Sequence, residues 1–181
     1  MLKKLGMALA ALVVAAAGLY FGMATRQAVS GKDEAIVAPT STLADSTTFP
    51  DVTLLGEDGQ PHRTHALLGP GGSVVLFLSL GCAPCKEMAH EWQRYVTAGK
   101  LGDIPLVAIA DSQLETIRLF KTNNDISFPI YADTTHTFTR RYSVDEYPLR
   151  LTVDGGHVIR SHTYDPSADE DLAETLKTIG R

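Results

Sequence analysis

The two cysteines of the chain lie directly between a predicted strand and a predicted helix, and this junction limits the fold more than any other feature. Residues 73–80 form a continuous run of apolar and β-prone residues, which is typical of a strand covered on both faces. After the sequence Gly81-Cys82-Ala83-Pro84-Cys85, apolar residues recur every three or four positions as far as Val96. This spacing predicts an amphipathic helix, and Pro84 fits its first turn because an N–H there has no partner within the helix.

A cysteine pair at the start of a helix is suited to disulfide chemistry. The thiolate is the attacking species in thiol–disulfide exchange, and the free N–H groups and dipole of a helix N-terminus stabilise it. We therefore expect Cys82 to be the exposed nucleophile and Cys85, one turn into the helix, to be the resolving thiol. Pro84 removes one N–H that could have bonded to the Cys82 sulfur, so we expect a moderately lowered Cys82 pKa and a rather reducing couple.

Other roles are also consistent with the spacing of this pair. The cysteines could form a structural disulfide, whereas a metal site would need further ligands, because the chain has no other cysteine. Attachment of haem requires a histidine after the second cysteine, where this chain has Lys86. A copper site that adds a distant histidine such as His157 or His162 stays open, although a Cys-x-x-Cys next to a βαβ pattern favours a redox motif. The sequence otherwise indicates no metal site and no cofactor.

The remaining patterns predict one α/β domain with a central mixed sheet flanked by helices. The predicted strands around the one at 73–80 are residues 52–55, 61–64, 105–110, 128–131, 149–153 and 157–163, and the predicted helices after the cysteine helix are 112–121, 134–142 and 167–179. We expect Asp111 or Ser112 to cap the helix at 112–121, and Asp154-Gly155-Gly156 to form the turn of the last hairpin. The sheet is then parallel in its first crossovers and antiparallel at this hairpin.

Residues 5–23 form an unbroken apolar segment without a charged side chain. As a helix, these 19 residues span about 28 Å, close to the hydrocarbon thickness of a bilayer. Lys3 and Lys4 precede the segment, so the positive-inside rule places the N-terminus in the cytoplasm. A cleaved signal peptide is the alternative, because Gly22-Met23-Ala24 offers small residues for cleavage, but the apolar run is longer than usual for one. We therefore expect a cytoplasmic N-terminus (1–4), a transmembrane signal anchor (5–23), a flexible linker (24–48) and a folded domain (49–181).

The charge of the chain argues against nucleic acid as a partner. The formal net charge is −5 at pH 7, and no cluster of lysine and arginine is interleaved with aromatic residues. A protein that binds the phosphate backbone of DNA or RNA presents such a basic surface. The sequence therefore predicts a domain that does not bind nucleic acid.

Several motifs together resemble the thioredoxin fold. They are the sequence Gly-Cys-Ala-Pro-Cys-Lys at 81–86, Phe128-Pro129, Tyr147-Pro148, and the strand at 149–153 followed by Asp154-Gly155-Gly156. More narrowly, the chain resembles the membrane-anchored extracytoplasmic TlpA/ResA-type proteins of bacteria, within the redoxin group. This resemblance implies that Pro148 has a cis peptide bond and packs opposite the disulfide, and that the backbone of Tyr147 pairs with the substrate peptide.

The resemblance also implies a function and a location. It implies a thiol–disulfide oxidoreductase that acts as a reductant and exchanges a Cys82–Cys85 dithiol with cysteine-containing exported proteins. Its electrons come from or go to a membrane electron donor or acceptor, and no cofactor is required. The domain is then a monomer on the periplasmic side of the bacterial inner membrane, with a single transmembrane pass. The alternatives are an accessory protein that forms disulfides and a module that binds or delivers copper on the same fold.

Three positions depart from the pattern of these proteins. Gly81 stands where a tryptophan usually precedes the first cysteine, so the docking surface loses an aromatic wall. Leu149 replaces the threonine that commonly follows the proline. The strand at 73–80 carries no carboxylate that could accept a proton, and Ser79 is its polar residue nearest the cysteines. These departures bear on the substrate and the rate more than on the fold.

One further resemblance and one motif that the chain does not match concern the segment that ends at Cys82. Residues 77–82 are similar to methylamine-utilisation accessory thioredoxin-like proteins, which assist disulfide formation in a partner, and this keeps an oxidative role open. Peroxiredoxins carry the motif P-x-x-x-[ST]-x-x-C, in which a proline precedes the cysteine by seven residues. Ser79 satisfies the hydroxyl position of that motif, but Val75 stands at the proline position, so we expect no peroxidase activity.

Overall fold

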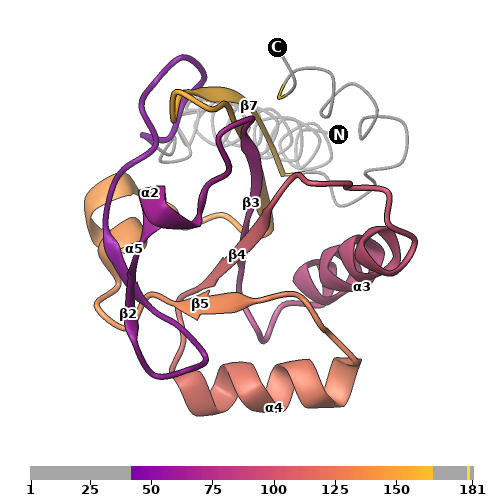
Figure 1. Ribbon diagram of the computed structural model, residues 1–181. Coiled ribbons are helices and arrows are strands. Elements are labelled where there is room, and N and C mark those ends of the chain that lie inside the picture. The colour runs from indigo at the N-terminus through magenta and orange to yellow at the C-terminus, as the bar shows by residue number, and fades with distance from the viewer. Residues whose placement is uncertain (1–41, 165–178, 180–181) are drawn as a thin grey trace, which may run out of the picture. The chain divides into compact units, whose positions relative to one another are not determined.

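The computed structural model describes residues 42–164 and Ile179, and their strands form one seven-stranded sheet with helices on both faces (Figure 1). The strands are β1 (Thr53–Leu55), β2 (Pro61–Arg63), β3 (Ser73–Leu78), β4 (Leu106–Ala110), β5 (Ile130–Ala132), β6 (Leu149–Val153) and β7 (Ile159–Thr163). The helices are α2 (Thr64–Leu67), α3 (Ala83–Thr97), α4 (Leu114–Asn124) and α5 (Thr137–Tyr142).

The strand order is β2-β1-β5-β4-β3-β6-β7, which places β4 and β3 near the middle of the sheet. β3 pairs in parallel with β4, and β4 pairs in parallel with β5, so α3 and α4 are the crossovers between them. β6 pairs antiparallel with β3, and β7 returns antiparallel beside β6. The structure thus confirms the predicted mixed sheet, with parallel first crossovers and an antiparallel last hairpin.

The central strands supply side chains to two hydrophobic cores, because successive residues of a strand point to opposite faces. On one face, Leu76 and Ala108 belong to the core that contains the buried side of α3 and α4. On the other face, Phe77 and Ile109 belong to the core that contains Phe138 of α5. Figure 1 shows α3 and α4 on one side of the sheet and α2 and α5 on the other. Because both faces are covered, all of β3 is buried, which explains its continuous apolar sequence.

The start of α4 differs from the prediction. α4 begins at Leu114, its N-cap is Gln113, and no side chain caps it, so the predicted cap by Asp111 or Ser112 is wrong. The Asp111 carboxylate is used elsewhere, since it accepts a hydrogen bond of 2.8 Å from the hydroxyl of Thr139 in α5. The Asp111 side chain is suited to capping a helix, but in this fold it bonds to a residue that is distant in the sequence.

Two other short elements also differ from their predicted bounds. The helix predicted at 134–142 is shorter, because His136 has a left-handed backbone with φ 55° and α5 begins after it. The carboxylate of Asp133 accepts the N–H of Phe138 and so satisfies one of the free N–H groups in the first turn of α5. Thr64 was predicted to end a strand but begins α2, and its hydroxyl is hydrogen-bonded to the backbone of the segment before β1.

The folded domain includes residues that were predicted to be linker. Leu43 is buried in the core, and Thr48 forms an antiparallel bridge with Val158. Residues 42–48 are therefore part of the folded domain, which begins before the predicted boundary at residue 49.

Two predicted segments fall wholly or mainly outside the described residues. The first is the predicted anchor at 5–23, together with the predicted linker as far as residue 41. The second is the predicted last helix at 167–179, of which the structure describes Ile179. Ile179 is buried in the same core as the inner side of α3. Among residues 42–164, no helix combines the length and apolar character needed to cross a bilayer.

The Asp154 carboxylate holds the turn between β6 and β7. It accepts the backbone N–H groups of Gly156 and Val158 at 2.9 and 2.8 Å, and the Arg160 guanidinium donates to it at 2.7 Å. These bonds, that from Val158 above all, lower the pKa of Asp154 below its ordinary value. A lowered pKa in the folded state means that the ionised carboxylate stabilises the fold.

We predict that Asp154→Asn lowers the free energy of unfolding by about 1 kcal/mol at neutral pH, the scale of one charge-assisted hydrogen bond. The contribution of Asp154 is present above its unfolded-state pKa and is lost as pH falls through the lowered folded-state pKa. Urea unfolding of both proteins between neutral pH and about pH 3 measures this effect. The difference between them should narrow as the pH falls, and a constant difference would show that the charge is not involved.

Candidate active site

Cys82 lies at the N-cap of α3, directly after the turn that follows β3. Its backbone N–H donates to the carbonyl of Ser79, and its carbonyl accepts the N–H of Lys86. Pro84 lies in the first turn of the helix, where its missing N–H interrupts no intrahelical hydrogen bond. The structure therefore confirms the predicted strand-to-helix junction.

Cys82 and Cys85 are joined by a disulfide, and their Cα atoms are 5.3 Å apart. Two backbone N–H groups point at the sulfurs: that of Cys85 lies 3.2 Å from the Cys82 Sγ atom, and that of Ser79 lies 3.4 Å from the Cys85 Sγ atom. Cys85 is fully buried, whereas Cys82 is partly exposed. This difference in access fits the predicted division of roles, in which Cys82 meets the substrate and Cys85 resolves the intermediate.

The peptide bond between Tyr147 and Pro148 is cis, as the resemblance implied. β6 begins directly after it and runs antiparallel to β3, so Leu149 lies opposite Phe77 and the proline lies at the cysteine end of the sheet. The carbonyl oxygen of Tyr147 is 4.0 Å from the Cys82 Sγ atom. The structure therefore brings the two cysteines and the two residues of this bond together. The pairing of the Tyr147 backbone with a substrate stays a prediction.

The side chain of Tyr147 is anchored by hydrogen bonds. Its hydroxyl donates to the carbonyl of Val144 at 3.0 Å and lies 3.4 Å from the hydroxyl oxygen of Thr139. Burial raises the pKa of the Tyr147 hydroxyl, so it is protonated at neutral pH. Thr139 and its partner Asp111 were not predicted from the sequence as site residues. The signal that could have identified Asp111 is its position directly after β4, whose end lies beside the end of β3.

A buried arginine lies under the helix that carries the cysteines. Arg150 is 2% exposed and lies on β6 opposite Leu76 of β3. Its guanidinium carbon is 5.9 Å from the ring centre of Trp92 in α3, within the range of a cation–π attraction. The sequence analysis did not single out this residue, although a charged residue in an apolar strand is a visible signal. β3 itself has no titratable side chain.

The two histidines considered as copper ligands do not lie beside the cysteines. His157 is in the turn after β6, and the last residue of β6, Val153, pairs with the first residue of β3, Ser73. Cys82 instead follows the last residue of β3. β3 has six residues and is roughly 20 Å long, so His157 lies at the other end of the sheet. His162 lies on β7 and is hydrogen-bonded to Asp45 at 2.8 Å. Across the described part of the chain, no three side chains of His, Cys, Asp or Glu form a group that could hold a metal ion.

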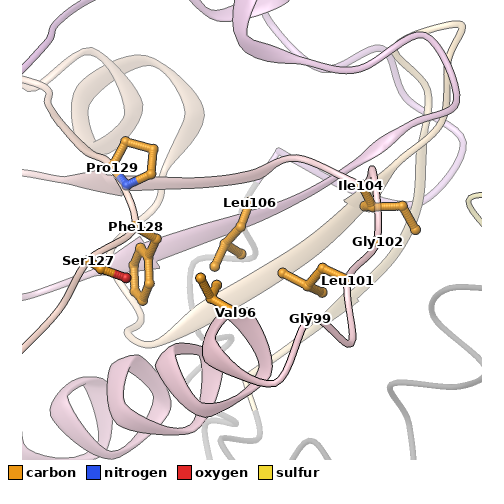
Figure 2. A pocket seen from close by; sticks show the side chains of 9 residues that line it. All are labelled: Val96, Gly99, Leu101, Gly102, Ile104, Leu106, Ser127, Phe128 and Pro129. Carbon is orange, nitrogen blue, oxygen red and sulfur yellow. The ribbon is translucent and has the colours of Figure 1, made fainter.

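The cavity in Figure 2 lies at the opposite end of α3 from the cysteines. Its volume is about 360 Å³, and Figure 2 shows its apolar side chains coming from the end of α3, the loop that follows it, the start of β4 and the segment before β5. The lining residues are Val96, Gly99, Leu101, Gly102, Ile104, Leu106, Ser127, Phe128 and Pro129. α3 has 15 residues and is about 22 Å long, so this cavity is separate from the cysteine site.

The sequence model of the AhpC/TSA family matches residues 46–162, which is more than half of the chain. No curated protein matches the chain in sequence.

Solved structures share the fold at low sequence identity. A thiol:disulfide interchange protein of the thioredoxin family from Chlorobium tepidum TLS has a TM-score of 0.61 and 18% identity, with 76% of this chain and 99% of that chain covered. StoA from Bacillus subtilis has a TM-score of 0.58 and 18% identity, with 73% and 98% covered. Peroxidoxin BcpB from Mycobacterium tuberculosis has a TM-score of 0.61 and 15% identity, with 76% and 96% covered. These likenesses confirm the thioredoxin-like fold predicted for the domain.

We predict that the reduced protein is alkylated first at Cys82, because that sulfur is partly exposed and Cys85 is buried. After a short treatment with iodoacetamide, mass spectrometry of the digested protein should find the label mainly on Cys82. Cys85→Ser should be labelled at nearly the same rate as the native chain, and Cys82→Ser much more slowly. Preferential labelling of Cys85 would contradict the assigned roles.

Proposed function

We propose that this chain, which belongs to the AhpC/TSA family and is a thiol–disulfide oxidoreductase with a thioredoxin-like fold, exchanges its Cys82–Cys85 pair with cysteines of exported proteins. In this role it acts as a reductant at the outer face of a bacterial inner membrane, held there by the predicted anchor at 5–23. The position of Cys82 carries the proposal. Its partly exposed sulfur caps α3, the Tyr147 carbonyl lies beside it, and its partner Cys85 is buried one turn into the helix.

The reaction follows from the two positions of the cysteines. The Cys82 thiolate attacks one sulfur of a substrate disulfide, so that a mixed disulfide forms and the other substrate sulfur leaves as a thiolate, which takes up a proton from water. The Cys85 thiol then gives up its proton and attacks the Cys82 sulfur, which releases the second substrate sulfur. Two electrons have passed to the substrate, and the chain ends with the Cys82–Cys85 disulfide. A membrane electron donor must reduce this disulfide before the next cycle.

The reducing direction is supported by the few groups that stabilise the Cys82 sulfur. In the described part of the chain, the Cys85 N–H reaches this sulfur at 3.2 Å, and Pro84 contributes no N–H. The neighbouring loop adds Asp145 and Glu146, which are exposed and negatively charged. A thiolate with little stabilisation leaves less readily from a disulfide, and its couple is a weaker oxidant. The same reasoning disfavours the accessory role in disulfide formation.

Peroxidase activity is not part of the proposal. One structural neighbour is a peroxidoxin from Mycobacterium tuberculosis. Val75 stands where the peroxidase motif has proline, and it is fully buried within β3, paired with Val107 and Leu151. The position is thus an ordinary strand residue in the core.

Reduction of insulin disulfides by the reduced full-length protein tests the exchange reaction. We predict that the native chain reduces insulin, and that Cys82→Ser loses the activity to the level of the uncatalysed reaction, because the nucleophile is gone. Cys85→Ser should react once and stop as a mixed disulfide with insulin.

Unchanged activity of the Cys82→Ser variant would contradict the proposal. A second result would also contradict the proposal: a native chain that exchanges no disulfides and, in its reduced form, binds one copper ion per molecule. That result would favour the copper-delivery module.

A further inference from the structure

Four side chains form a series of polar contacts that ends at the residue before the cis proline. We define the Tyr147 brace as His136, Asp111, Thr139 and Tyr147. The His136 Nδ1 atom contacts the Asp111 Oδ1 atom, Thr139 donates to the Asp111 Oδ2 atom at 2.8 Å, and the oxygen of Thr139 is 3.4 Å from that of Tyr147. The brace draws on three parts of the fold, since Asp111 follows β4, Thr139 lies in α5 and Tyr147 precedes β6.

The hydrogens of the two hydroxyl groups determine how the brace is connected. Thr139 has one hydroxyl hydrogen, and the short bond to Asp111 uses it. Tyr147 is therefore the donor toward Thr139, and it shares its hydrogen between the Thr139 oxygen at 3.4 Å and the Val144 carbonyl at 3.0 Å. Thr139 thus connects a carboxylate to the tyrosine, and no other residue of the brace contacts both.

The brace acts on the part of Tyr147 that faces Cys82. The carbonyl of Tyr147 is 4.0 Å from the Cys82 Sγ atom, and the cis peptide bond that follows leads directly into β6. β6 fixes the chain after Pro148 through its pairing with β3. On the other side of the cis bond, residues 144–147 belong to no strand or helix. Val144 is buried and its N–H donates to the carbonyl of Phe138, and the Tyr147 hydroxyl holds the end of this loop next to the cis bond through Val144 and Thr139.

We propose that Thr139 is a positioning residue for substrate docking: through the Tyr147 brace it holds the backbone before Pro148 at the distance from Cys82 that a bound peptide requires. The inference rests on the proposed exchange function and adds a residue to it. A peptide must lie along this backbone edge while its sulfur reaches Cys82, whereas a small dithiol needs only access to the sulfur. Loss of the brace therefore weakens the reaction with peptides and leaves the intrinsic reactivity of the disulfide unchanged.

The test compares Thr139→Val, which removes the hydroxyl and keeps the shape of the side chain, with Thr139→Ser, which keeps the hydroxyl. Each full-length protein is measured with insulin as the peptide substrate and, in its oxidised form, with dithiothreitol as the small reductant. For Thr139→Val we predict a rise in the insulin KM of about three- to tenfold, the scale of one hydrogen bond. The kcat and the rate with dithiothreitol should stay within about twofold, and Thr139→Ser should restore the native KM.

Two further variants keep the test decisive. Thr152→Val removes a buried threonine hydroxyl of β6 that is hydrogen-bonded to Ser161 at 2.6 Å, outside the brace, and should leave the insulin KM unchanged. Tyr147→Phe removes the bonds of the hydroxyl to both Thr139 and Val144. Adding Thr139→Val to it should raise the KM no further, because the link to Thr139 is already gone. Tyr147→Phe also replaces Thr139→Val if that protein does not fold.

The outcomes separate this inference from the proposed function. If the native chain reduces insulin but Thr139→Val has the native KM, the inference is wrong and the proposed function stands. Equal losses with insulin and dithiothreitol would assign Thr139 a general structural role and would also overturn the inference. If the native chain does not exchange disulfides at all, both fail together.

Discussion

The packing of α3 against the end of β3 is the constraint on which the rest of the structure depends. β3 is buried along its whole length, and α3 covers one of its faces with its fully buried residues Cys85, Met88 and Trp92. The short turn between these elements leaves Cys82 as the N-cap, with its sulfur at the helix terminus. Burial of one cysteine and partial exposure of the other follow from this packing, because Cys85 points into the core and Cys82 lies at its edge.

The second constraint is the antiparallel pairing of β6 with β3. Because β6 begins at the cysteine end of the sheet, the residues just before it meet the turn between β3 and α3. The Tyr147 carbonyl thereby comes within 4.0 Å of Cys82, although the two residues are far apart in the sequence. The site is thus formed by the N-terminus of α3 and the residues just before β6, and β3 positions both.

Features set by local patterns could be predicted from the sequence, whereas features set by contacts between distant residues could not. The strand–cysteine–helix junction follows from the spacing of apolar residues, and the cis bond at Pro148 followed from resemblance. The predicted cap of α4 was wrong because Asp111 bonds to Thr139, 28 positions away. The spacing of apolar residues along the sequence does not indicate such a contact. At Arg150 the sequence shows a charged residue within an apolar strand, but it does not show that the guanidinium lies over the ring of Trp92 in another element.

The reduction potential of the Cys82–Cys85 couple tests the central claim most directly, because it shows whether the pair cycles and in which direction it passes electrons. The full-length protein, equilibrated in a series of thiol–disulfide buffers, should titrate as one two-electron couple. We predict a midpoint nearer to the reducing end of the known range, at about −270 mV, than to its oxidising end, at about −120 mV. A midpoint near the oxidising end would contradict the role as a reductant, and a pair that cannot be reduced and reoxidised reversibly would contradict the exchange function itself.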